Sequence, residues 1–194
     1  MKTVKRYVLD TSLFVNPAAR APFGNSPQAA VESFIRIAGK SEAEFYMPPS
    51  IFRELFNFAP NISQFEGVVK RKAPNIYSIY LPAAVFYEFV DDIRARVNKG
   101  LRLAEEFAVD NRPDNDEKLR RLRDKYRDSM RAGIVDSKED FEIILLAYEL
   151  EAAIVTCDEG IFHLANKIGC EWLDASKFHS VLSKGKGKKK KAKK

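Results

Sequence analysis

The sequence predicts an α/β fold in which helices cover both faces of a parallel sheet. The clearest evidence is a helical apolar stripe over Phe141 to Leu150 that leads into a short apolar run, Ala152 to Thr156. Such runs are typical of strands that are covered on both faces. The N-terminal run Tyr7 to Leu9 is similar. Acidic residues follow both runs, and in open α/β sheets the working site lies beyond the carboxyl ends of the strands.

Length and charge divide the chain into one domain and a tail. The 194 residues are 45% hydrophobic, which is enough for the core of one domain. The net charge of +6 comes from residues 183–194, which hold eight lysines and no acid, and residues 1–182 have 25 basic and 27 acidic residues. We therefore predict a domain over 1–182 and a disordered lysine-rich tail over 183–194. Such a tail can bind any polyanion, and a role in solubility is an equal alternative.

Two further features bear on location. There is no run of 18 apolar residues and the N-terminal apolar run is too short for a signal peptide, so we expect no membrane span or membrane partner. Cys157 and Cys170 lack metal-ligand spacing and lie near predicted strands. We interpret them as reduced core thiols, which indicates a cytoplasmic protein.

The first part of the chain alternates strands and helices. After the strand at Tyr7 to Leu9, Ser26-Pro27 starts a helix that runs to Ala38, with Ser as N-cap and Pro in the first position. Glu44 to Met47 is the second predicted strand, and a short helix follows over residues 50–58. Ile76 to Leu81, with Pro on both sides, is predicted as the third strand.

A long helical hairpin is predicted as an insertion at about 84–131. Apolar residues step by three or four from Ala84 to Val109, a turn follows over 111–116, and a second helix ends at Gly133. The outer faces are rich in arginine, at Arg94, Arg96, Arg102, Arg120, Arg121, Arg123, Arg127 and Arg131. These arginines are either a solvated face balanced by nearby acids or a binding surface. The two apolar stripes must seal against each other or against another subunit.

The C-terminal part contains a short helix over Phe162 to Ile168 and a fifth strand, Glu171 to Leu173. His163 and His179 have no second ligand at metal spacing, so we assign them to packing or to the surface.

Five acids fall at strand ends or helix starts: Asp10, Glu54, Asp136, Asp140 and Asp158. Each also has an ordinary explanation, because Asp caps helices and forms turns, and Glu54 could pair with Arg53. Carboxylates gathered in one cleft stay ionised only with cations between them, and oxygen ligands without His or Cys favour Mg²⁺ or Mn²⁺. Such ions can activate a water molecule and stabilise the leaving oxygen of a phosphodiester, which is the chemistry of a nuclease. A phosphatase that uses Asp as nucleophile usually carries a second Asp at the position of Ser12, so a nuclease is the better interpretation.

These motifs, in this order, resemble the PIN-domain ribonucleases. The resemblance rests on Asp10 in VLDTS, Glu54 in SIFREL, and the run from Asp140 to Asp158, and it covers 1–82 and 134–180. It implies a three-layer fold with a five-stranded parallel sheet of order 3-2-1-4-5.

The long hairpin and the extra acid in VDSKED resemble, more narrowly, the minimal protein-only ribonuclease P family, also called RNA ligase partner proteins. That family removes the 5′ leader of precursor tRNA, and its dimers join through the hairpin into larger rings. The resemblance implies a magnesium site at Asp10, Asp136, Asp140 and Asp158, with Glu54, Glu142 and Ser12 as candidates for supporting roles. Arginines of the hairpin would then bind RNA, with Arg94, Arg96, Arg120, Arg121, Arg123 and Arg127 as the candidates. The alternatives are a toxin-type PIN ribonuclease and a non-catalytic RNA-binding partner of an RNA ligase.

Overall fold

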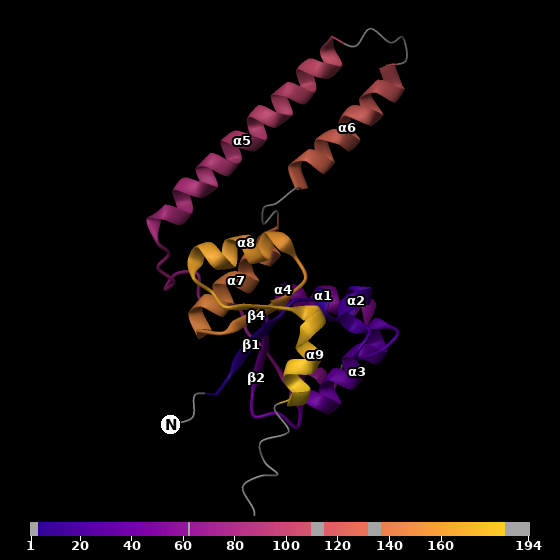
Figure 1. Ribbon diagram of the computed structural model, residues 1–194, viewed down its shortest axis with the longest axis vertical. Coiled ribbons are helices and arrows are strands. Elements are labelled where there is room, and N and C mark those ends of the chain that lie inside the picture. The colour runs from indigo at the N-terminus through magenta and orange to yellow at the C-terminus, as the bar shows by residue number, and fades with distance from the viewer. Residues whose placement is uncertain (1–3, 62, 110–114, 132–136, 185–194) are drawn as a thin grey trace, which may run out of the picture.

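The computed structural model describes residues 4–61, 63–109, 115–131 and 137–184 and has helices on both faces of one sheet (Figure 1). The five strands are all parallel and lie in the order β3-β2-β1-β4-β5. This confirms the predicted fold class and strand order. The strands are β1 (Arg6–Leu9), β2 (Glu44–Met47), β3 (Val69–Arg71), β4 (Ala153–Thr156) and β5 (Trp172–Asp174).

Two groups of helices cover the sheet. On one face α7 packs on β1, β4 and α8, and on the other face α9 packs on β4, β5 and the three N-terminal helices. A further helix follows β2, and a short 3-10 turn precedes β3. The bounds are α1 (Ser12–Val15), α2 (Pro17–Arg20), α3 (Pro27–Ala38), α4 (Pro49–Phe58), η1 (Phe65–Gly67), α7 (Lys138–Leu150), α8 (Glu159–Ile168) and α9 (Ala175–Lys184).

Local sequence signals explain where several helices begin and end. Ser26 caps α3 by accepting a hydrogen bond from the backbone N–H of Ala29 (3.2 Å), and Pro27 takes the first helical position. Gly169 ends α8 with φ +83°, a left-handed conformation that glycine adopts without steric cost. The bounds of α3 and β2 agree with the prediction.

Aromatic side chains fill the core on the α9 side of the sheet. Phe14, Phe34, Phe45 and Phe178 are all fully buried. The rings of Phe34 and Phe45 meet edge to face at 5.3 Å, and Tyr7 meets Phe178 at 5.0 Å, which are favourable aromatic geometries. This packing joins the first two strands to α3 and α9.

The predicted third strand, Ile76 to Leu81, is wrong. Residues 76–81 form turns and irregular structure, and the third strand is Val69–Arg71. This strand has three residues and lies at the edge of the sheet. Its residue Val69 is buried, and its other two residues are exposed. The prediction failed because so short an edge strand shows no apolar run in the sequence. The apolar residues that suggested a strand, among them Tyr77 and Tyr80, are exposed instead.

The predicted helical hairpin is present and projects away from the sheet (Figure 1). It consists of α5 (Ala83–Ala108) and α6 (Asn115–Arg131). The segment leading into it is held by α7, because Glu149 binds the Lys72 ammonium (2.7 Å) and the backbone N–H of Asn75 (2.7 Å). The entry to the hairpin therefore has a fixed attachment to the core.

The C-terminal part contains the predicted helix and fifth strand, but α8 begins at Glu159 rather than Phe162 and β5 is Trp172–Asp174 rather than Glu171 to Leu173. Helix α9 was not predicted, and it continues to Lys184, two residues into the predicted tail; residues 185–194 lie outside the described part of the chain. Both cysteines are free, and burial raises the pKa of Cys170 to about 11. Among the described helices, none has the length and apolar character needed to cross a bilayer.

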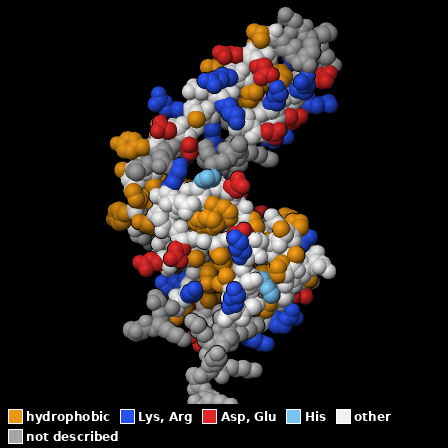
Figure 2. Space-filling model, viewed as in Figure 1, with side chains coloured by type: hydrophobic (Ala, Val, Ile, Leu, Met, Phe, Trp, Pro, Cys, Tyr) orange, Lys and Arg blue, Asp and Glu red, His pale blue; other side chains and the backbone are white. Residues whose placement is uncertain are grey.

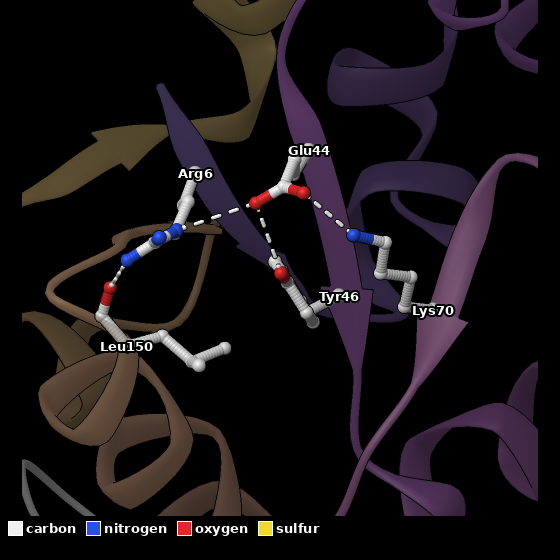
Figure 3. A network of polar contacts seen from close by, with 5 residues as sticks. All are labelled: Arg6, Glu44, Tyr46, Lys70 and Leu150. Atoms are coloured by element: carbon white, nitrogen blue, oxygen red, sulfur yellow. Dashed lines mark hydrogen bonds and ion pairs between the residues drawn. The ribbon is translucent and has the colours of Figure 1, made fainter. Parts of the chain in front are cut away.

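A polar network connects the first three strands on the side of the sheet where β1 and β2 begin (Figure 3). The Glu44 carboxylate binds Lys70 (2.6 Å), Arg6 (3.3 Å) and the hydroxyl of Tyr46 (3.0 Å). Arg6 also donates to the backbone carbonyl of Leu150 at the end of α7 (3.1 Å). Hydrogen bonds from Lys70 and Tyr46 lower the pKa of Glu44 below its ordinary value of 4.5.

Replacing Glu44 by Gln is expected to lower the melting temperature at neutral pH, because the amide cannot form these ion pairs. A carboxylate whose pKa is lowered by folding stabilises the protein above its unfolded pKa, and this stabilisation is lost as pH falls through the folded pKa. The difference in melting temperature between wild type and Glu44→Gln should therefore shrink below pH 4.5. A difference that stays constant down to about pH 3 would contradict this linkage.

Candidate active site

Asp10 occupies the carboxyl end of the central strand and is held by several partners. It directly follows β1, its side chain is buried, and its backbone N–H donates to the carbonyl of Val155 (3.1 Å). Its Oδ2 accepts hydrogen bonds from the hydroxyls of Ser12 (2.5 Å) and Thr156 (2.6 Å). Thr156 is fully buried at the end of the neighbouring strand β4. The carboxylate is thus fixed in one orientation at the edge of the sheet where sites of this fold class lie.

Asp158 lies at the same edge, between β4 and α8. Its Oδ1 caps α8 by accepting from the backbone N–H of Ile161 (3.0 Å), and its own N–H donates to the Thr156 hydroxyl (3.0 Å). This capping is an ordinary structural role for Asp158, where the sequence had suggested a turn as the ordinary explanation. It does not exclude a second role, since an exposed carboxylate has further acceptor capacity at its other oxygen.

Asp140 lies in the first turn of α7. The hydroxyl of Ser137 caps this helix by accepting from the backbone N–H of Asp140 (3.0 Å). Because α7 leads into the start of β4, its first turn lies at the carboxyl edge of the sheet. Glu139 lies in the same turn. Asp136, the other acid predicted before this helix, lies outside the described residues.

Glu54 completes the group from α4. Burial, followed by the negative charge of Asp10, raises its pKa, a hydrogen bond from Thr11 lowers it, and the charge of Glu139 raises it further. These neighbours place Glu54 beside the other acids of this edge. Glu54 therefore has Asp10 and Glu139 as charged neighbours, and its role in the site stays a prediction. The ion pairs found within the described residues do not include one between Glu54 and Arg53.

Glu142 has a different environment from the other predicted acids. Its Oε2 accepts a hydrogen bond from the hydroxyl of Ser50 (2.5 Å), and its Oε1 lies 4.0 Å from the Lys138 ammonium. Ser50 is in the first turn of α4, so this contact joins the start of α7 to the start of α4. The structure thus gives Glu142 a partner that aligns the helices carrying Asp140 and Glu54.

The donors at this edge are chemically suited to a hard divalent cation. They are carboxylate and hydroxyl oxygens, which suit magnesium and manganese rather than zinc. Burial and, next, the negative charge of Asp10 raise the pKa of Glu54, and a cation would offset the part of this shift that comes from the charge. Within residues 4–61, 63–109, 115–131 and 137–184, no three His, Cys, Asp or Glu side chains already converge as a ligand set.

Sequence reasoning missed two residues of this site. Thr156 was assigned only to the apolar run of its strand, although its hydroxyl contacts both Asp10 and Asp158. Glu139 was passed over because it adjoins the more obvious Asp140. A hydroxyl two residues before the strand-end Asp158, across from the Asp10-Thr11-Ser12 run, is the signal that could have found Thr156.

The predicted RNA-binding arginines all lie on the hairpin rather than at the acidic edge. Figure 2 shows basic and acidic side chains interspersed along it. Some charges balance one another, as in the pairs Arg127–Asp124 (3.6 Å) and Lys125–Glu106 (2.8 Å). Others are exposed, namely Arg94, Arg120, Arg121 and Arg123, whereas Arg96 is partly buried. The hairpin is therefore neither a pure basic surface nor a fully neutralised one.

Comparisons with known proteins agree with this arrangement. Residues 6–185 match the PINc domain ribonuclease family. The RNA-free ribonuclease P of Pyrococcus furiosus is 46% identical, covering 91% of this chain and 92% of the relative. That of Thermococcus onnurineus is 47% identical over 91% of this chain and 93% of the relative. The RNA-free ribonuclease P of Thermodesulfovibrio yellowstonii is 42% identical over 92% of this chain and 93% of the relative.

Proposed function

Because the chain belongs to the RNA-free ribonuclease P family of PINc domain ribonucleases, we propose that it is a Mg²⁺-dependent endoribonuclease that removes the 5′ leader of precursor tRNA. The observation that carries this proposal is the acidic edge of the sheet, where the hydroxyls of Ser12 and Thr156 hold Asp10 near Glu54 and the loop of Asp158. The membership fixes the protein-only ribonuclease P type of activity, and the metal, the site residues and the assembly are our inferences.

A divalent cation bound here would activate a water molecule and stabilise the leaving oxygen of a phosphodiester. Asp10 would hold it from the end of β1 and Asp158 from the end of β4, with Mn²⁺ as an alternative to Mg²⁺. Asp140, in the first turn of α7, and Asp136, which lies outside the described residues, would bind metal or orient the water. Ser12 orients Asp10, and Glu142 aligns the two helices through Ser50.

Glu54 has a supporting electrostatic role in this proposal. Burial and, next, the charge of Asp10 raise its pKa, and a bound cation would lower that pKa again because it favours the charged carboxylate. Glu54 would then add negative charge near the metal without being a direct ligand.

The hairpin would bind the folded part of the tRNA and join subunits. Its exposed arginines can contact phosphates, which supply most of the affinity for a nucleic acid. Its first helix also carries a stripe of exposed apolar residues, namely Phe86, Phe89, Val90, Ile93, Val97 and Leu101. A second copy of the chain is the proposed partner, giving homodimers that assemble into a larger homo-oligomer. Both cysteines being free fits action in the cytoplasm.

Cleavage of a precursor tRNA tests this function directly. Purified protein is expected to cut once, at the 5′ end of the mature tRNA, in Mg²⁺ and not in excess EDTA. Sequencing of the products separates the proposal from the toxin-type activity, which would give scattered or anticodon-loop cuts. No cleavage by protein that binds the RNA in Mg²⁺ would instead favour a non-catalytic partner of an RNA ligase.

A further inference from the structure

Two hydroxyls beside Asp10 have matching sets of partners. Ser12 Oγ donates to Asp10 Oδ2 and accepts from the backbone N–H of Cys157 (2.9 Å). Thr156 Oγ1 donates to the same Oδ2 and accepts from the backbone N–H of Asp158 (3.0 Å). The two hydroxyl oxygens lie 3.4 Å apart. The pair therefore links one carboxylate oxygen to two successive N–H groups of the loop between β4 and α8.

The direction of each hydroxyl proton follows from these partners. A backbone N–H can only donate, so it takes a lone pair of the hydroxyl that it contacts. Each hydroxyl has a single proton, and Asp10 Oδ2 is a short-range acceptor for it. Both protons are thus directed at one oxygen of an ionised carboxylate, and such charge-assisted hydrogen bonds are the stronger kind.

We propose that Thr156, together with Ser12, is a positioning residue that fixes the rotamer of Asp10 and couples it to the loop carrying Asp158. Oδ2 is occupied by two short hydrogen bonds, whereas Oδ1 accepts only a long contact from Thr11 among those found here (3.3 Å). Oδ1 is therefore the oxygen with capacity left for a cation. The catalytic role of this positioning rests on the proposed function, whereas the hydrogen bonds of the two hydroxyls do not depend on it.

Of the two hydroxyls, that of Thr156 contacts both Asp10 and Asp158, so its removal should affect the orientation of both acids. It is fully buried in β4, so water cannot readily replace its hydroxyl. Removing that hydroxyl deletes one donor to Asp10 and the acceptor for the N–H of Asp158. Both candidate metal ligands then lose an orienting contact, and hydrogen bonds of this kind behind a metal ligand typically change metal affinity by about 10–100-fold.

The test compares Thr156→Val, which keeps shape and loses the hydroxyl, with Thr156→Ser, which keeps the hydroxyl. Binding of Mn²⁺ without RNA is measured by electron paramagnetic resonance, and the Mg²⁺ concentration at half-maximal cleavage is measured with precursor tRNA. We expect the valine variant to bind Mn²⁺ about 10-fold more weakly or worse, with a matching rise in the Mg²⁺ requirement. The serine variant should restore both to near wild-type values.

The matched control is Ser33→Ala, which removes another buried hydroxyl, one on α3 that accepts from Arg36. It should lower thermal stability without changing metal affinity. If Thr156→Val does not fold, Ser12→Ala removes the second donor and carries the same expectation. Wild-type Mn²⁺ affinity in a folded Thr156→Val variant would overturn the proposal, as would equal losses in the valine and serine variants. Failure of wild-type protein to cleave precursor tRNA would count against the proposed function alone, because the Mn²⁺ series has its own readout.

Discussion

Asp10→Asn is expected to reduce cleavage of precursor tRNA by more than about 100-fold in saturating Mg²⁺, since loss of a direct ligand should exceed the effect of losing an outer hydrogen bond. The amide is neutral, so it removes a full negative charge from the candidate site. It keeps the size of the side chain and retains one carbonyl oxygen that can accept from Ser12 and Thr156.

The fold should survive this change. Burial and, next, the charge of Asp10 raise the pKa of Glu54, so the Asp10 carboxylate repels a neighbour in the metal-free protein. Removing that charge relieves repulsion and should let the pKa of Glu54 fall toward its ordinary value. We therefore expect a melting temperature at or above that of wild type in EDTA, and a smaller gain on adding Mg²⁺.

Single-turnover cleavage with excess protein is the measurement, with circular dichroism as the check on folding. The matched control is Glu44→Gln, which neutralises an acid at the opposite, amino end of the sheet. Glu44→Gln should lower the melting temperature and leave cleavage unchanged, whereas Asp10→Asn should keep the melting temperature and lose cleavage. Wild-type cleavage by a folded Asp10→Asn protein would contradict the placement of the chemistry at this edge.

The parts of the fold that sequence could predict are those with strong local patterns. Three such patterns correspond to observed elements. The apolar run before Asp158 is β4, the Ser26-Pro27 cap begins α3, and the long apolar stripe of the hairpin lies on α5. The third strand could not be found in this way. Its position is set by pairing with β2, and of its three residues only Val69 is buried. Pairing between distant segments leaves little trace in so short a sequence.

The candidate site shows a similar division. The acids were found because the ends of parallel strands meet at one edge, so Asp10 and Asp158 could be placed from the strands alone. Side-chain partners were not predictable, since Ser12 and Thr156 meet only after β1 and β4 have paired. The role of Glu142 likewise depended on Ser50, which is 92 residues away. Asp136 stays a prediction.

Replacing residues 86–131 with a short Gly-Ser linker is expected to give a folded monomer that loses most activity on precursor tRNA. The replacement keeps Val85, which packs into the main core. It also keeps the contacts of Glu149 with Lys72 and Asn75, which hold the entry segment outside the hairpin. The sheet and its acidic edge should therefore form as before, and Mn²⁺ binding without RNA should be retained.

The reason to expect a change in assembly is the apolar stripe of α5. Phe86, Val97 and Leu101 are 62%, 62% and 57% exposed in the single chain. Fully burying side chains of this kind is worth roughly 1.5–3 kcal/mol each, so we expect a self-complementary contact between two such helices. Figure 2 also shows hydrophobic side chains gathered near the end of the hairpin that is closer to the core.

A pair of point variants separates the stripe from the rest of the hairpin. Val97→Lys places a charge on the stripe, whereas Asn98→Lys places the same charge on the next residue, which is exposed and polar. Only the first should dissociate the oligomer in light scattering. Activity on precursor tRNA should fall with dissociation, because a second subunit would hold the far end of the tRNA at a fixed distance from the cut. A 22.1 kDa species for the wild-type protein at micromolar concentration would contradict both the assembly and this measuring role.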